Sequence, residues 1–242
     1  IYARNDAPVR RKEGLFLENH LLWGQEPPDL LEIVECGHRF LVDLRRGHKT
    51  GFYLDQRENR SRTATHCPGA DVLNAFAYTG GFGVYAGRAG ARSVVNVDTS
   101  TDALVLAEDN LALNGCPPQE LIAGDSFQVL RHFRDEGRAF DLVVLDPPKF
   151  AASQSQVRSA TRGYKDVNLL AMQLLRPGGL LVTFSCSGLV SSDLFQKVVF
   201  GAGVDARRDV QIIDRLAQGP DHPVLLSFPE SAYLKCLACR VW

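Results

Sequence analysis

The sequence predicts an α/β fold in which a seven-stranded, mostly parallel sheet carries helices on both faces. From residue 70 onward, short apolar runs alternate with helical patterns, an order typical of parallel strands joined by right-handed crossovers. The runs are almost continuously apolar, which indicates strands that are buried on both sides. Most of them end in glycine-rich or polar turns, where such sheets bind ligands.

The first 60 residues predict a small β-rich lead-in, followed by a main domain over residues 61–242. Two apolar runs, Leu30–Cys36 and Arg39–Leu44, flank Gly37-His38 and indicate a β-hairpin. A helix is expected over 56–65. The first residue is Ile1 rather than Met, so we expect a further N-terminal piece before it.

The main domain alternates strands and helices. Strands are expected over 72–76, 93–97, 121–123, 140–145, 180–184, 209–214 and 232–242. Helices are expected over 84–89, 101–114, 126–136, 164–175 and 193–201. Ser100 or Thr101 would cap the second of these helices, and Arg176-Pro-Gly-Gly179 would end the fourth.

The composition excludes several classes of protein. The chain has 242 residues, of which 45% are hydrophobic and 23% charged, as in soluble globular proteins. No apolar run approaches the roughly 18–20 residues of a membrane span. No secretion leader opens the chain either, so we expect a cytoplasmic protein. The net charge of −1 excludes a strongly basic nucleic-acid binder, so RNA contacts would come from local patches.

Two clusters of basic residues are candidates for such patches. One comprises Arg45, Arg46, His48 and Lys49, and the other comprises Arg158, Arg162 and Lys165. For each cluster alone, a solvated face is an equally good interpretation.

The six cysteines do not indicate a disulfide framework, because the chain is long and carries no secretion signal. Cys236 and Cys239 have the spacing of a metal-binding or redox pair. They lie in an apolar run that is expected to be a strand, where residues three apart point to opposite faces. We therefore expect neither a shared metal nor a redox pair at these cysteines, and no metal site elsewhere.

The residues at the ends of consecutive strands predict a nucleoside site. The stretch 77–83 contains three glycines, which let the backbone approach a ligand beside a helix N-terminus. Asp98 ends the second strand and could accept from both hydroxyls of a ribose. Asp125 follows the third strand and could accept from an adenine amino group, with Phe127 stacked on the ring. Each feature alone is commonly a turn or a helix cap, and it is their combination that favours a nucleoside.

A dinucleotide such as NAD is an alternative ligand, because Gly81-x-Gly83-x-x-Ala86 followed by Asp98 fits the dinucleotide pattern. This alternative leaves Asp146-Pro-Pro-Lys-Phe150, after the fourth strand, unexplained. Two prolines fix a stiff, extended loop, which is suited to hold a flat base beside a reactive methyl group. The sequence therefore favours a site for methyl transfer over one for NAD.

Cys186 lies between two serines at the end of the fifth strand. The simplest interpretation is a small interior residue. A thiolate adding to C6 of cytosine, however, would make C5 enamine-like and able to attack the methyl group of S-adenosylmethionine (SAM). A base would then remove the C5 proton and the thiol would leave. Asp146 could hydrogen-bond the ring near N3 and favour the charge that develops there. No residue stands out as the base.

These residues resemble a known family. Over essentially its whole length, the chain is similar to the RlmI-like family of 23S ribosomal RNA (cytosine-C5)-methyltransferases, which are class I SAM-dependent enzymes. The matching stretches are 10–14, 48–57, 76–82, 97–100, 146–150, 162–166, 184–188, 193–197, 221–223 and 233–235.

The resemblance implies a Rossmann-like methyltransferase fold that forms 5-methylcytidine in 23S ribosomal RNA, with Cys186 and Asp146 as catalytic residues. SAM would be the cofactor and S-adenosylhomocysteine its product. Ribosomal RNA would be the partner, with Lys149, Arg162 and Lys165 as candidate phosphate contacts. An N-terminal PUA domain, an RNA-binding barrel, would precede Ile1, and the family's tendency to dimerise would make the protein a homodimer.

The resemblance and the strand-end pattern together give a set of candidate cofactor-binding residues. The set is Tyr53, Asp55, Gln56, Arg57, Phe76, Tyr78, Thr79, Gly80, Gly81, Asp98, Thr99, Ser100, Asn110, Asp125, Ser126, Phe127, Asp146 and Pro147.

One departure concerns product release. Better-known RNA cytosine-C5 enzymes carry a second cysteine beside the proline of the loop after strand four, where this chain has Pro148-Lys149. A different group would therefore act in release. Two alternatives stay open. A SAM-dependent RNA nitrogen methyltransferase, for example one for guanine N7, would not need Cys186, and a non-catalytic RNA- or SAM-binding module would tolerate Cys186→Ser.

Overall fold

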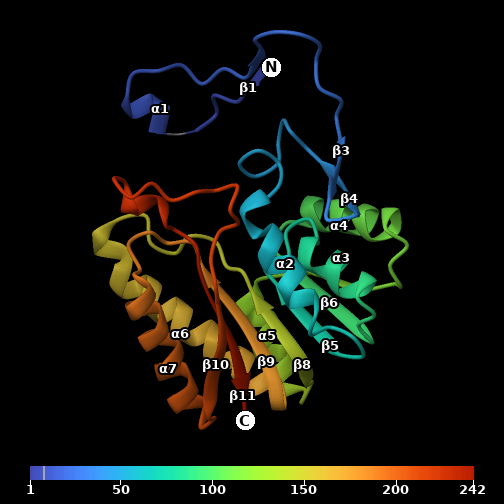
Figure 1. Cartoon of the computed structure of the whole chain (residues 1–242), viewed down its shortest axis with the longest axis vertical. Coiled ribbons are helices and arrows are strands. Elements are labelled where there is room, and N and C mark those ends of the chain that lie inside the picture. The colour runs from blue at the N-terminus through green and yellow to red at the C-terminus, as the bar shows by residue number, and fades with distance from the viewer. Residues whose placement is uncertain (8) are drawn as a thin grey trace. The chain divides into compact units, whose positions relative to one another are not determined.

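The computed structural model describes residues 1–7 and 9–242 and divides into two compact units, Ile1–Tyr53 and Leu54–Trp242 (Figure 1). The division lies before the expected limit at residue 60, because the helix that begins at Arg57 packs with the second unit. None of the described helices combines the length and the apolar character needed to cross a membrane.

The first unit is the small β-rich segment expected from the sequence. Strands β1 (Tyr2–Ala3) and β2 (His20–Leu21) pair antiparallel, with the short helix α1 (Val9–Lys12) between them in the chain. Strands β3 (Leu31–Glu35) and β4 (His38–Val42) form the predicted hairpin.

The hairpin turn lies one residue before the expected Gly37-His38. It consists of Cys36 and Gly37, whose φ angles are 49° and 79°. Two-residue hairpin turns favour positive φ at both positions, because their twist then matches that of the strands. The β1–β2 pair and α1 were not expected from the sequence, since these elements are too short to leave a periodic pattern.

The second unit contains the predicted seven-stranded sheet, in the order β10-β11-β9-β8-β5-β6-β7. All strands run parallel except β11, which pairs antiparallel with both β9 and β10. The strands are β5 (Asp71–Ala75), β6 (Ser93–Asp98), β7 (Glu120–Ala123), β8 (Phe140–Leu145), β9 (Leu175–Ser185), β10 (Val210–Leu216) and β11 (Lys235–Val241).

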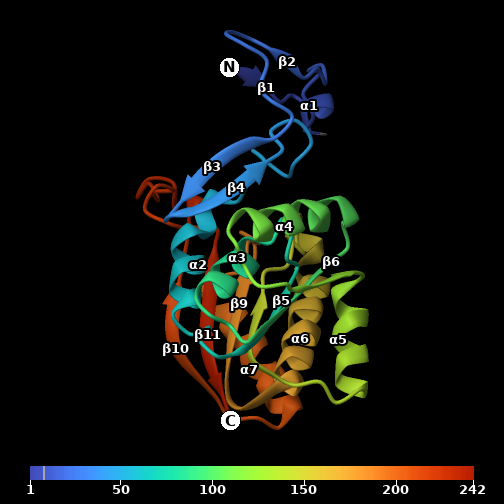
Figure 2. The same cartoon turned by 90° about the vertical axis from the view of Figure 1, so that its right-hand side faces the viewer.

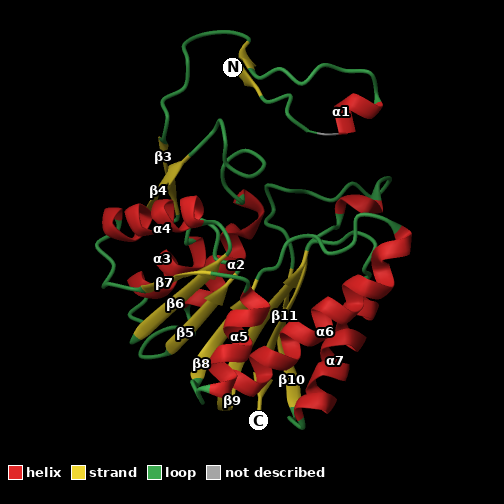
Figure 3. Cartoon of the chain, turned by 180° about the vertical axis from the view of Figure 1, so that it is seen from behind, coloured by secondary structure: helices red, strands yellow, loops and turns green. Residues whose placement is uncertain are grey.

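Helices cover both faces of this sheet, as Figures 2 and 3 show. One face carries α2 (Arg57–Ala64), α3 (Gly81–Arg88) and α4 (Thr101–Leu113), and the other α5 (Ser126–Asp135), α6 (Val157–Leu174) and α7 (Ser192–Ala206). Two apolar clusters fill the space on the two sides, and both draw on β5, β8 and β9. The expected α/β fold with a doubly covered sheet is thus confirmed.

Three elements differ in their limits from the sequence-based expectation by five residues or more, and one of them is α7, which ends at Ala206 rather than at residue 201. Helix α6 begins at Val157 rather than at residue 164, because Ser153 and Gln156 form a capping box that starts the helical path earlier. Strand β9 begins at Leu175 rather than at residue 180. The Pro-Gly-Gly stretch lies inside the strand as an irregularity, with Gly178 at a φ of 80° and a register shift against β8.

An ion-pair network joins four strands at the amino-terminal edge of the sheet. Asp71 accepts hydrogen bonds from Arg92 Nε and Ser93 Oγ, both at 2.8 Å, and pairs with Arg176 at 3.1 Å. Asp141 accepts from the Asp71 backbone N–H at 2.9 Å and pairs with Arg176 at 2.9 Å. The hydrogen bonds from Arg92 are the main reason that the pKa of Asp71 lies far below its ordinary value.

Candidate functional site

The parallel strands bring the polar residues singled out in the sequence to one edge of the sheet, here called the carboxyl edge (Figure 3). Strands β5 to β9 run in the same direction, so the residues at their carboxyl ends gather there. These residues are 76–81, 98–100, 125–127, 146–147 and Cys186. Because β11 is antiparallel, its first residue, Lys235, also lies at this edge and pairs with Ser185.

The turn between β5 and α3 has an unusual backbone. Phe76, Tyr78 and Gly80 have φ angles of 63°, 48° and 77°, and this left-handed region costs a non-glycine residue roughly 1–2 kcal/mol. The buried Asn110 donates from Nδ2 to the Thr79 carbonyl oxygen at 3.0 Å. The turn is therefore held in one shape against the N-terminus of α3, whose first N–H groups have no partner within the helix.

Asp98 is fixed by this turn. Its Oδ2 accepts from the Tyr78 backbone N–H at 2.8 Å, and its Oδ1 accepts from the Ser100 N–H at 2.9 Å. Each carboxylate oxygen can accept a further hydrogen bond, so the group can still take the two hydroxyls of a ribose. Ser100 caps α4 by accepting from the Ala103 N–H at 3.2 Å, as predicted, and Thr99 is exposed.

The residues after β7 combine a helix cap with an aromatic contact. Asp125 is exposed and caps α5 by accepting from the Gln128 N–H at 3.0 Å. The Oγ of Ser126 is buried and has no hydrogen-bond partner among the described residues. The ring of Phe127 lies edge-on to that of Phe76, with 6.4 Å between their centres. Asp125 thus serves as an exposed helix cap.

Asp146 is held by the segment that opens the second unit. Gln56 is buried and donates from Nε2 to Asp146 Oδ2 at 2.9 Å. Asn59, also buried, donates to Gln56 Oε1 at 2.6 Å, which fixes the orientation of the Gln56 amide. Gln56 thus contacts Asp146, and its predicted contact with SAM stays a prediction.

The neighbours of Gln56 contact the segment that joins β10 to β11. Tyr233 donates from its hydroxyl to Asp55 Oδ2 at 2.5 Å, and Arg57 pairs with Asp221 at 2.9 Å. Burial is the largest cause that raises the pKa of Tyr233, followed by the hydrogen bond to Asp55. Tyr53, the remaining candidate of this stretch, ends the first unit, where its hydroxyl lies 3.5 Å from His48 Nδ1.

Cys186 lies between the loop after β8 and the start of β11. Its side chain is partly exposed, and its Sγ lies 3.9 Å from the carbonyl oxygen of Pro147. The buried Ser187 beside it bonds with the hydroxyl of Tyr164 at 3.0 Å, which fixes the turn that carries the thiol. The structure thus brings the two predicted catalytic stretches, Asp146-Pro147 and Cys186, into contact.

Lys235 is a residue of this site that the strand-end reasoning missed. Its Nζ donates to the Ser187 carbonyl oxygen at 2.7 Å. The pKa of Lys235 is lowered to about 8, mainly by burial. The thiol group of Cys186 acts to raise this pKa, and the charge of Lys149 acts to lower it further. The sequence shows that a charged residue opens an otherwise apolar strand. It does not show where that strand lies in the sheet, so it could not place Lys235 beside Cys186.

The candidate phosphate contacts differ in their surroundings. Lys149 and Arg162 are exposed, whereas Lys165 pairs with Asp205 of α7 at 2.7 Å. A phosphate at Lys165 would therefore compete with an ion pair between two helices. Their role in binding RNA stays a prediction.

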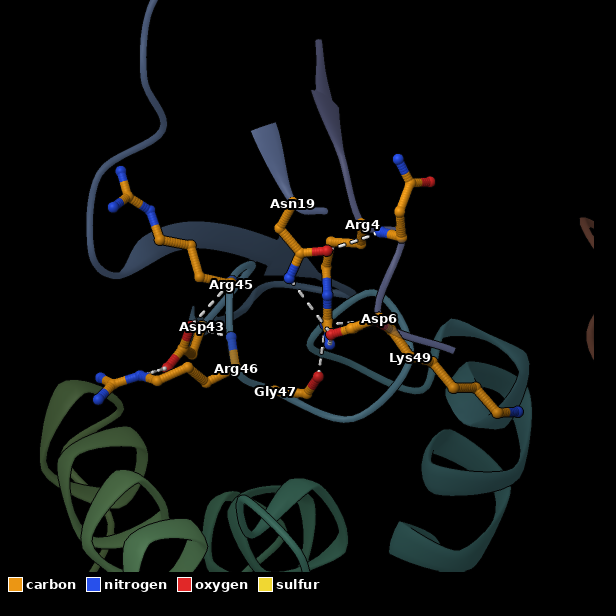
Figure 4. Close-up of polar contacts among 9 residues, drawn as sticks. Arg4, Asp6, Asn19, Asp43, Arg45, Arg46, Gly47 and Lys49 are labelled. Carbon is orange, nitrogen blue, oxygen red and sulfur yellow. Dashed lines mark hydrogen bonds and ion pairs between the residues drawn. The ribbon is translucent and has the colours of Figure 1, made fainter. Parts of the chain in front are cut away.

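The first basic cluster lies in the loop after β4 (Figure 4). Asp43 accepts from the backbone N–H of Arg46 at 2.8 Å and pairs with its guanidinium at 3.1 Å. Arg4 donates to the carbonyl oxygens of Gly47 and Lys49, both at 2.6 Å. These contacts hold the loop in one shape and use part of the charge of the cluster.

Cys236 and Cys239 point to opposite faces of the sheet, as predicted, since they belong to different apolar clusters. Burial raises the pKa of both thiols, that of Cys239 to about 12. Neither a shared metal nor a disulfide fits this arrangement.

Known proteins resemble the chain in sequence and in structure. The ribosomal RNA large subunit methyltransferase I of Shewanella denitrificans is 54% identical over all of this chain and 62% of its own length. The protein of the same name from Cronobacter sakazakii is 53% identical over all of this chain and 61% of its own length. The chain therefore spans about three fifths of these curated relatives.

A solved methyltransferase in complex with SAH has the same fold, with a TM-score of 0.83 and 26% identity over 92% of this chain and 58% of its own. The family described as S-adenosylmethionine-dependent methyltransferases matches residues 19–240. This match spans most of the chain and agrees with the Rossmann-like sheet and the polar residues at its carboxyl edge. The chain belongs to the S-adenosylmethionine-dependent methyltransferase family.

Proposed function

We propose that the protein transfers a methyl group from SAM to C5 of a cytosine in 23S ribosomal RNA. The position of Cys186 is the observation that carries this proposal. Its partly exposed sulfur follows β9 and lies 3.9 Å from the Pro147 carbonyl oxygen, beside the loop suited to hold a base. The names of the relatives, which methylate large-subunit ribosomal RNA, support the choice of substrate.

The residues of the carboxyl edge fit SAM. Asp98 would accept from its ribose hydroxyls, and the N–H groups at the start of α3 would meet its carboxylate. The exposed Asp125 would accept from the adenine amino group, and the buried Oγ of Ser126 offers a further polar atom without a described partner. When bound, SAM supplies an electrophilic methyl group.

Cys186 would act as the nucleophile. Its thiolate adds to C6 of the cytosine, so C5 gains the electron density that it lacks in the aromatic ring and accepts the methyl group. A base, for instance a water molecule, would then take the C5 proton, and the electron pair of the C5–H bond would restore the C5–C6 double bond as the C6–S bond breaks and the thiolate leaves. Asp146, held by Gln56 at 2.9 Å, would hydrogen-bond the cytosine near N3 and stabilise the adduct.

The exposed Lys149 and Arg162 would contact phosphates of the RNA, and Lys165 would do so when its pair with Asp205 opens. An enzyme for ribosomal RNA would act in the cytoplasm. The resemblance noted in the sequence further implies a homodimer, which sedimentation analysis would test.

Replacing the nucleophile tests the proposal. We expect Cys186→Ala to lower 5-methylcytidine formation at least about a thousandfold, because a thiolate adduct is needed to activate carbon. The measurement is methyl transfer from labelled SAM to ribosomal RNA, with the product located by mass mapping. Cys116→Ala is the matched control, since this half-buried thiol lies between α4 and β7, away from the carboxyl edge.

The outcome also separates the alternatives. A nitrogen methyltransferase would keep its activity in Cys186→Ala, because nitrogen already carries a lone pair. Unchanged C5 product in this variant would refute the thiol mechanism, and the absence of any methylated RNA with the wild-type protein would refute the proposed substrate.

A further inference from the structure

Lys235 contacts the residues on both sides of Cys186. As the first residue of β11 it pairs with Ser185 of β9, and its Nζ donates to the carbonyl oxygen of Ser187 at 2.7 Å. The ammonium group is thereby fixed at the turn that carries the thiol, and it interacts electrostatically with Cys186. No part of the proposed reaction uses this lysine.

We propose that Lys235 is a positioning residue whose ammonium group holds Cys186 in the thiolate form, ready to add to a pyrimidine. The inference rests on the proposed function, because it concerns the same thiol. Thiolates are stabilised by neighbouring cations, and a partly buried pair is less screened by water than an exposed one.

The other groups around Cys186 do not supply the same charge. Tyr164 and Tyr233 are neutral at physiological pH, because burial raises the pKa of each hydroxyl. Cys236 is fully buried, and burial keeps it protonated. Among the acidic groups, Asp146 is engaged by Gln56 and Asp55 by Tyr233.

Lys149, in the loop after β8, is a second cation, and it interacts electrostatically with Lys235. It is exposed, so water screens its charge, whereas Lys235 is half-buried and anchored by a hydrogen bond. The two ammonium groups repel each other, and this repulsion adds to the effect of burial in lowering the pKa of Lys235 to about 8. Lys235 is charged below that pH, where the thiol would otherwise be protonated.

Two variants separate the effect of the positive charge of Lys235 from the effect of its hydrogen bond to Ser187. Lys235→Gln keeps a donor for the Ser187 carbonyl but removes the charge, whereas Lys235→Arg keeps both. Lys197→Gln is the matched control, because this exposed lysine of α7 pairs only with Asp193 at 2.8 Å among the contacts described for it.

The test is the rate at which iodoacetamide alkylates Cys186 between pH 6 and pH 10, followed on the Cys186 peptide by mass spectrometry. A neighbouring opposite charge shifts such an equilibrium by roughly one pH unit or more. We expect the midpoint of the Lys235→Gln profile to lie about one pH unit above that of the wild type, with Lys235→Arg and Lys197→Gln close to the wild type.

Two results would overturn the inference. One is a Lys235→Gln midpoint equal to that of the wild type, and the other is a Lys235→Arg midpoint that rises as far as that of Lys235→Gln. If Lys235→Gln does not fold, Lys235→Met replaces it, because it also removes the charge at a similar side-chain length, and an unshifted midpoint in Lys235→Met would overturn the inference.

Alkylation needs neither RNA nor SAM, so this test is independent of the substrate. A shifted midpoint in a protein that methylates no cytosine would support the inference and refute the proposed function. An unshifted midpoint in a protein that forms 5-methylcytidine would do the reverse.

Discussion

Gln56 and Asp146 lie 90 positions apart in the sequence, and a single hydrogen bond joins their side chains. Asn59 donates a hydrogen bond to Gln56 Oε1. The oxygen of the Gln56 amide therefore faces Asn59, and its nitrogen faces Asp146. The pair shows how one buried amide can orient a carboxylate at the carboxyl edge. Gln56 is therefore best described as a positioning residue for Asp146.

Gln56→Glu keeps the shape of this side chain but turns the donor into an acceptor. Two carboxylates would then face each other, and their repulsion raises the pKa of one of them. We expect methyl transfer at neutral pH to fall at least tenfold, with a new ionisation in the pH–rate profile. Gln173→Glu, at an exposed position of α6, is the control. A profile identical to that of the wild type would show that Gln56 does not position Asp146.

Among the elements, the start of α3 depends on a glycine that precedes it. Gly80 has a φ of 77°, and a Cβ there would lie 2.9 Å from the Cβ of Ala107 on α4. Gly90, after the same helix, has a φ of 85° but open space around its missing side chain. The two glycines share the backbone conformation and differ only in their neighbours.

Replacing each glycine by alanine separates strain from steric conflict. The left-handed backbone costs roughly 1–2 kcal/mol in both variants. We expect Gly80→Ala to lose more free energy of unfolding than Gly90→Ala in urea titrations, and to weaken SAM binding in calorimetry, since α4 must move away. Equal losses in the two variants, with unchanged affinity for SAM, would contradict this account.

The sequence predicted each element of the main sheet, because buried parallel strands leave long apolar runs between clear turns. It misplaced the start of α6 and of β9, where a capping box and an irregular Pro-Gly-Gly segment outweigh the simple signals of helix and loop. The gathering of the strand-end residues at one edge was predicted as well, because it follows from the parallel order of the strands. Lys235 was not, because its place depends on the insertion of β11 beside β9, a long-range pairing that no local pattern reveals.

At the scale of the whole molecule, the carboxyl edge and the amino-terminal edge of the sheet carry different kinds of residues. The carboxyl edge carries strained turns and half-buried ionisable groups. At the amino-terminal edge, Asp71, Asp141, Arg92 and Arg176 tie β5, β6, β8 and β9 together. The ion-pair network thus lies at the edge of the sheet opposite to the candidate site.

This network makes the stability depend on pH. The pKa of Asp71 is lower in the folded protein than the unfolded value of about 3.8, mainly because of its hydrogen bonds with Arg92. Its contribution is therefore complete above that value and is lost as the pH falls below it. We expect Asp71→Asn to lower the melting temperature at pH 7 and to lower it less at pH 3, because the contribution of Asp71 is lost progressively between the unfolded pKa and the much lower folded pKa. Asp193→Asn, in an exposed pair, should change little at either pH. A difference for Asp71→Asn that persists undiminished in acid would contradict the assignment.

The strand order has a consequence for the newly made protein. Strand β11 is the last of the sheet to be synthesised, yet it lies in the interior between β9 and β10. During translation, β9 keeps an open edge until residues 235–241 emerge, and an open edge invites pairing with other chains. If Lys235 acts as proposed, the same delay keeps Cys186 apart from Lys235, and the thiol would gain its reactive form only when β11 joins the sheet.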